Sequence, residues 1–296
     1  MYQQLDIFND SRDVALRNDM AQALLDGDPL AAKRIADTLL AEFGTDPVLA
    51  PGAVLVAFQH WQHAAAAQGP LDVATVLDTQ HRLDGPVAAA AAAVFGAQRA
   101  ANWLAAQWRW LAGQAAGIGW LAPQAQAHAA ALYLRGQAWS QAAEAVARIE
   151  SWRRIPVPLL WMTQARWRGV GADAAWPLLA EALWLAPARA AMLRAALADA
   201  RLDKLVARFE EHFDPDADPV AVWPWLPAFA LVDQPLLAGP LADAVPPTDF
   251  APGLAFSVVM ALLRLERQGR HHEIVAQRAR LKALSAPLFT AYMSTR

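Results

Sequence analysis

The sequence predicts an all-α protein, an α-α superhelix of stacked helical hairpins, and three observations support this fold class. Alanine, the best helix former, is very abundant, whereas Val, Ile and Thr, which favour strands, are sparse. Hydrophobic residues make up 56% of the 296 residues and charged residues only 18%, which is enough apolar material for a sizeable core. Apolar residues recur at helical spacing, and turns interrupt the helical stretches at regular intervals.

The first hairpin follows a short N-terminal peptide, residues 1–12, which is predicted to be extended. Residues 9–11 (Asn, Asp, Ser) supply candidate N-caps for a helix that runs from about residue 13 to residue 25. Gly27-Asp28-Pro29 then breaks the helix, and proline suits the first turn of the next one. The second helix is expected to end near Gly44.

The same unit recurs later in the chain as helix, turn and helix. Turns at Gly136, at Gly169 and at about Arg201 are spaced 32 to 33 residues apart, and Gly269 lies 68 residues beyond Arg201. Between them, residues 222–246 are irregular and predict shorter helices with turns. The four expected hairpins cover residues 130–150, residues 159–187 with a turn at Gly169–Gly171, residues 192–213 with a turn at Asp199–Asp203, and residues 258–284.

This period resembles that of the tetratricopeptide family, whose repeats are about 34 residues long. The resemblance covers about half of the chain. It implies one helical-repeat domain over residues 13–296, with a subdivision near residues 214–222 as an alternative, and a concave groove for a peptide or protein. The matching residues are Ala175, Leu179, Ala182, Leu183 and Pro187 in the clearest unit, Ala130, Tyr133, Gly136 and Ala142 in another, and Gly27, Asp28 and Ala32 in the first.

A short motif near the N-terminus, Gln4-Leu5-Asp6-Ile7-Phe8, resembles the peptide that bacterial proteins use to dock on the replication sliding clamp. The resemblance implies that Gln4 hydrogen-bonds the rim of the clamp cleft and that Leu5 and Phe8 fill two pockets. Asp6 would stay at the polar edge, and Ile7 stands where leucine is more usual. The alternative interpretation is that the apolar residues of the motif cap the first hairpin by packing on its helices.

Tryptophan occurs thirteen times and is interleaved with arginine. Buried tryptophan is ordinary core, but Trp and Arg also dominate the hot spots of protein interfaces. The same residue types stack bases and contact phosphates in single-stranded nucleic-acid binders. The net charge of −3 makes a nucleic-acid partner the weaker alternative. The candidate partner or nucleic-acid surface comprises Arg109, Trp110, Arg153, Arg154, Arg166 and Arg168.

The sequence carries no enzyme, cofactor or metal signature. The absence of cysteine excludes disulfides, thiolate metal ligands and thiol catalysis. No nucleophile elbow, phosphate-binding loop or HExxH motif occurs, and residues 85–143 contain no Asp or Glu. His60 and His63 share a helix face, but no nearby acid completes a metal site, and His81 is the one candidate for a third histidine. The acidic run 214–219 lacks the central glycine and closing glutamate of a calcium loop.

Location and function follow as expectations from these observations. Residues 1–13 are acidic and polar, with no signal-peptide core. A long stretch without Asp, Glu, Lys or Arg, 110–134, contains Gly, Pro and Gln and is interpreted as two buried helices rather than a membrane span. We therefore expect a cytoplasmic, non-enzymatic adaptor that binds a protein partner and is tethered to the sliding clamp through residues 4–8. The alternatives are a scaffold with no clamp link and a single-stranded nucleic-acid binder.

Overall fold

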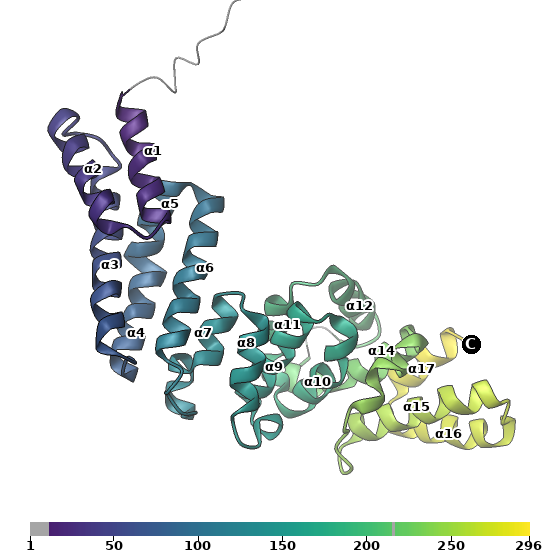
Figure 1. The fold of residues 1–296 in the computed structure, drawn as a ribbon. Helices are drawn as coiled ribbons and strands as arrows, with labels where there is room; N and C mark the ends of the chain where they lie inside the picture. Colours follow the sequence, from purple (N-terminus) through teal and green to yellow (C-terminus); the bar gives the residue numbers. More distant parts are fainter. Residues whose placement is uncertain (1–11, 215–216) are drawn as a thin grey trace, which may run out of the picture. The chain divides into compact units, whose positions relative to one another are not determined.

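The computed structural model describes residues 12–214 and 217–296, and Figure 1 shows this part as a succession of packed helices. Of these residues 81% are helical and none lies in a strand. The helices pack mainly on their neighbours in the sequence. The prediction of an all-α fold is confirmed, and the packing is consistent with a helical array.

The chain forms two compact units, of which the first ends at Ala138 and the second begins at Trp139. The first unit contains α1 (Arg12–Leu25), α2 (Pro29–Glu42), α3 (Leu49–Gln68), α4 (Val73–Arg82), the π-helical turn η1 (Leu83–Val87), α5 (Ala88–Phe95), α6 (Ala97–Gln114), the 3-10 helix η2 (Ala122–Ala127) and α7 (Ala129–Arg135).

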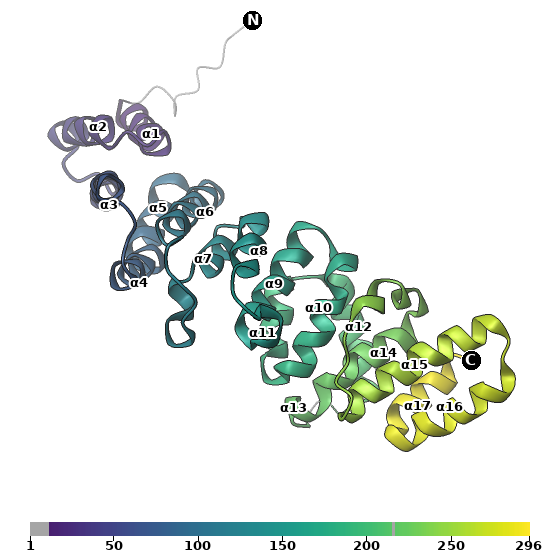
Figure 2. The same cartoon turned by 60° about the horizontal axis from the view of Figure 1, so that its bottom comes forward.

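Figure 2 shows the helices of the first unit in a view turned by 60°. Large side chains on several of these helices build its core. Leu24 of α1, Phe58 of α3 and Leu111 of α6 are all almost completely buried. Two buried amides also join α3 to α6, because Gln62 Nε2 donates to Gln107 Oε1 over 2.6 Å. The first unit therefore has a core of its own that α1, α3 and α6 share.

The predicted hairpin turns are largely confirmed. Asp28 caps α2 by accepting the Ala31 N–H over 2.8 Å, with proline in the first turn. Gly269 joins two helices in the left-handed conformation, at φ 67°. The turn expected at Asp199–Asp203 lies earlier, because Asp199 is itself the N-cap of the following helix and accepts the backbone N–H groups of Arg201 and Leu202.

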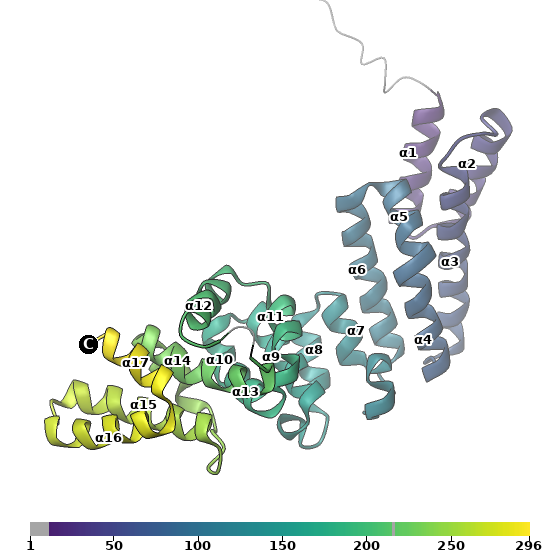
Figure 3. The ribbon, with the colours of Figure 1, turned by 180° about the vertical axis from the view of Figure 1, so that it is seen from behind.

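The second unit is organised around α10 (Ala172–Leu185), in which every residue from Ala175 to Trp184 is buried. Its neighbours include α9, α14 and two short 3-10 helices, η5 and η7. Figure 3 shows the C-terminal helices α15, α16 and α17 side by side from behind. The other elements are α8 (Trp139–Ala147), η3 (Trp152–Arg154), α9 (Pro156–Gly169), η4 (Pro187–Arg189), α11 (Ala190–Leu197), α12 (Ala200–Glu210), α13 (Pro219–Val222), η5 (Trp223–Trp225), α14 (Leu226–Asp233), η6 (Pro235–Ala238), η7 (Pro240–Asp243), α15 (Ala251–Gln268), α16 (His271–Leu284) and α17 (Ala286–Ser294).

The irregular segment 222–246 consists of short helices and turns, as its proline content predicts. Among the described residues no single helix is long and apolar enough to cross a membrane, and one bent pair, Pro219–Asp233 with Pro235–Asp243, meets the length and composition test. After η7 residues 244–247 have no regular secondary structure, and a turn at residues 248–250 leads into α15. We call this connection, residues 244–250, the strap.

Candidate functional site

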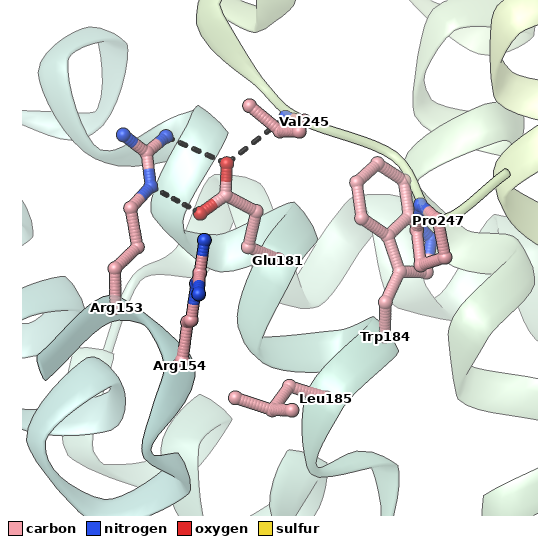
Figure 4. Close-up of a pocket in the computed structure, with 7 residues that line it drawn as sticks. All are labelled: Arg153, Arg154, Glu181, Trp184, Leu185, Val245 and Pro247. Carbon is pink, nitrogen blue, oxygen red and sulfur yellow. Dashed lines mark hydrogen bonds and ion pairs between the residues drawn. The ribbon is translucent and has the colours of Figure 1, made fainter. Parts of the chain in front are cut away.

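A pocket of about 410 Å³ opens in the second unit where the strap passes α10 (Figure 4). Three elements supply its walls: the 3-10 helix η3, the C-terminal half of α10 and the strap. We call it the strap pocket, and its lining residues are Arg153, Arg154, Glu181, Trp184, Leu185, Val245 and Pro247.

One buried carboxylate holds the three walls of the strap pocket together. The side chain of Glu181 is only 10% exposed, and both of its oxygens accept hydrogen bonds from Arg153, the one from Nη2 over 2.6 Å. Glu181 Oε1 also accepts the backbone N–H of Val245 over 2.9 Å. The hydrogen bond to Glu181 raises the pKa of Arg153, as expected for a guanidinium paired with a carboxylate. Glu181 therefore fixes both the arginine and the strap.

Arg154 gives the strap pocket a positive charge that no ion pair within the described residues neutralises. Its side chain is exposed, and no ion pair joins it to any acidic residue in the described part of the chain. Arg153 and Glu181 cancel each other, so the lining residues carry one net positive charge. An arginine in this position has donors free for an anionic partner.

The rest of the strap pocket is apolar. Trp184 is 8% exposed, and its Nε1–H donates to the Pro224 carbonyl over 3.1 Å, so its ring offers only apolar surface. Phe256 of α15 supports that ring edge-on, with centroids 5.2 Å apart. At the mouth, Leu185 and Val245 are 42% and 68% exposed. Exposed apolar side chains at a pocket rim are typical of interaction sites.

The strap is anchored at both ends. At one end Val245 donates to Glu181, and Arg153 Nη2 donates to the Asp243 carbonyl over 3.3 Å. At the other, Pro247 lies so close to Gly253 that a Cβ there would stand 2.6 Å from the Pro247 oxygen. The strap has two faces. Val245 and Pro247 line the strap pocket, whereas Ala244 and Pro246 line a second cavity of about 500 Å³ beside α15.

The predicted arginine and tryptophan surface is divided between the two units. In the first unit, Arg109 Nη1 donates to the Gly136 carbonyl over 2.9 Å, and Trp110 packs edge-on against Trp61 with centroids 5.7 Å apart. These two side chains are thus engaged in contacts within the unit.

The clamp-like motif, Gln4, Leu5, Asp6, Ile7 and Phe8, lies outside the described residues.

In the second unit the strap pocket brings Arg153 and Arg154 together, but the other two predicted arginines lie elsewhere. Arg166 lines a separate cavity of about 400 Å³ between α8 and α9. Arg168 Nη1 donates to the Leu197 carbonyl over 3.2 Å, and its guanidinium lies 5.6 Å from the Trp139 ring centroid. Several tryptophans expected to be core, including Trp103, Trp108, Trp167 and Trp176, are buried.

Sequence reasoning missed five of the seven residues that line the strap pocket, namely Glu181, Trp184, Leu185, Val245 and Pro247. One signal was available, because Glu181 is the only charged residue between Asp173 and Arg189. A single acid inside an apolar helix predicts a buried ion pair.

Comparisons with known protein families, with curated proteins and with solved structures found no match to this chain. No group of three metal-binding side chains occurs in the part of the chain that the structure describes.

Proposed function

We propose that this chain is a non-enzymatic adaptor and that the strap pocket holds a segment of a protein partner. The observation that carries the proposal is the unneutralised guanidinium of Arg154 beside exposed Leu185 and Val245. Arginine and bulky apolar residues at one pocket are the composition of interface hot spots. Glu181 supports a binding role over acid–base chemistry, because both carboxylate oxygens are already engaged in holding Arg153 and the strap.

A photo-crosslinking side chain in place of Leu185 tests this function. We expect it to capture one reproducible protein partner in cells, whereas the same side chain in place of Met192, which is 56% exposed on α11, does not capture it. The captured protein, once purified, is expected to bind the unmodified chain and to bind Arg154→Glu at least about tenfold more weakly. Equal capture at both positions, or equal affinity for both chains, would reject the proposal.

The clamp-like motif supports a second element of the proposed function, a tether. Gln4-Leu5-Asp6-Ile7-Phe8 combines three bulky apolar side chains with one amide and one carboxylate. Three such side chains contribute about 1.5–3 kcal/mol each when buried. After the cost of ordering the peptide, micromolar affinity for a sliding clamp is expected. The adaptor would then bring the partner in the strap pocket to the clamp.

A further inference from the structure

We infer that the strap pocket selects a partner segment in which a Glu or Asp side chain lies next to a bulky apolar side chain. This inference rests on the proposed function and adds the chemistry of the partner. The carboxylate of the segment pairs with Arg154, and the apolar side chain packs against Trp184 and Leu185.

The balance of donors and acceptors in the strap pocket favours an anionic ligand. Its one carboxylate, Glu181, already accepts three hydrogen bonds, two from Arg153 and one from the Val245 amide. Trp184 donates its indole N–H away from the pocket, to Pro224. The side-chain donors that remain for a ligand are the guanidinium of Arg154 and Nη1 of Arg153, and an arginine only donates. A ligand that fits must therefore supply acceptors, and a carboxylate supplies them with the complementary charge.

The size and composition of the strap pocket require an apolar side chain next to that carboxylate. Its volume of about 410 Å³ falls within the usual range for ligand pockets. Trp184, Leu185 and Pro247 present carbon surface to it. A purely acidic ligand would leave this carbon surface exposed to water, whereas burying an apolar side chain against it is favourable.

The strap determines how the segment is recognised. The Val245 N–H is bonded to Glu181, and Pro246 and Pro247 have no N–H. Residues 245–247 therefore offer no free backbone donor, and a partner cannot add to the strap as a strand. Recognition rests on side chains. Because Leu185 and Val245 line the strap pocket and are also exposed to solvent, a protein segment covers more of their surface than a free small acid does.

Short fluorescein-labelled Gly/Ser peptides with a central Glu-Phe-Leu, Gln-Phe-Leu or Lys-Phe-Leu test the inference by fluorescence anisotropy on the full chain. The Glu-Phe-Leu peptide is expected to bind with a dissociation constant of about 100 μM or tighter. The Gln-Phe-Leu peptide is expected to bind about tenfold more weakly, because it loses a charge-assisted hydrogen bond. The Arg154→Glu variant is expected to reverse the order of the peptide affinities and to bind Lys-Phe-Leu most tightly. The matched control is Arg189→Glu, at an exposed arginine of η4, which keeps the wild-type order.

The reversal of preference also guards against a folding artefact, since a misfolded variant would lose binding to every peptide. Equal binding of the three peptides overturns the inference, as does no binding of Glu-Phe-Leu at about 1 mM. Binding of free 3-phenylpropionate as tightly as the peptide overturns it too, because the pocket would then take small acids. None of these results removes the partner captured through position 185, so failure of the inference is distinguishable from failure of the proposed function.

Discussion

Gly253→Ala is expected to lower the free energy of unfolding by about 1–3 kcal/mol, the usual cost of overpacking a core. Gly253 is buried in the first turns of α15, against the strap. A Cβ there would lie 2.6 Å from the Pro247 oxygen and 3.1 Å from the Pro247 nitrogen. Both are backbone atoms, and Val245, two residues earlier, is tied to Glu181. The strap therefore cannot yield without breaking that hydrogen bond or moving α15.

A second glycine provides a control of opposite sign. Gly113 lies in α6, and a Cβ there would meet nothing within 4 Å. Gly113→Ala is expected to stabilise the chain by up to about 1 kcal/mol, because alanine is the better helix former. Urea unfolding followed by circular dichroism measures both variants. A Gly253→Ala chain as stable as Gly113→Ala would contradict the close packing of the strap on α15.

The double substitution Leu5→Ala, Phe8→Ala is expected to weaken binding to a bacterial sliding clamp by at least about a hundredfold. Removing two bulky side chains forfeits about 3–6 kcal/mol of burial in the clamp cleft. Surface plasmon resonance with immobilised clamp measures the loss, and the matched control is Met192→Ala, which removes an exposed apolar side chain elsewhere.

Thermal stability distinguishes the two interpretations of the clamp-like motif. If residues 4–8 are a free ligand, the double variant melts at the wild-type temperature while clamp binding is lost. A melting temperature lower by several degrees would instead mean that Leu5 and Phe8 pack on the first hairpin. Unchanged clamp binding, or none in the wild type, would contradict the tether.

Hairpin turns were predictable because their signals are local. Asp28 with Pro29 begins α2, and Gly269 ends α15, each through the conformation that its residue type favours. Proline predicts the ends of helices less reliably. Pro86 lies inside the π-helical turn between α4 and α5, and Pro177 lies inside α10, where neighbouring packing keeps the chain helical. Tertiary contacts there outweigh the local preference.

The candidate site was not predictable as a whole, because its parts are remote in the sequence. Glu181 bonds to Arg153, 28 residues before it, and to Val245, 64 residues after it. Arg153 and Arg154 were singled out from their residue types, but nothing local distinguished them from Arg166 and Arg168. The structure separates the two pairs, since only the first reaches the strap.

Hydrogen–deuterium exchange of the full chain with the partner captured through position 185 tests the central claim most directly. If the strap pocket is the partner site, exchange is expected to slow in the three walls of the pocket, at residues 153–154, 184–186 and 244–250. Exchange in α16, which contributes nothing to the pocket, is expected to stay unchanged. Protection confined to the first unit or to α16, with the three walls unaffected, would contradict the account.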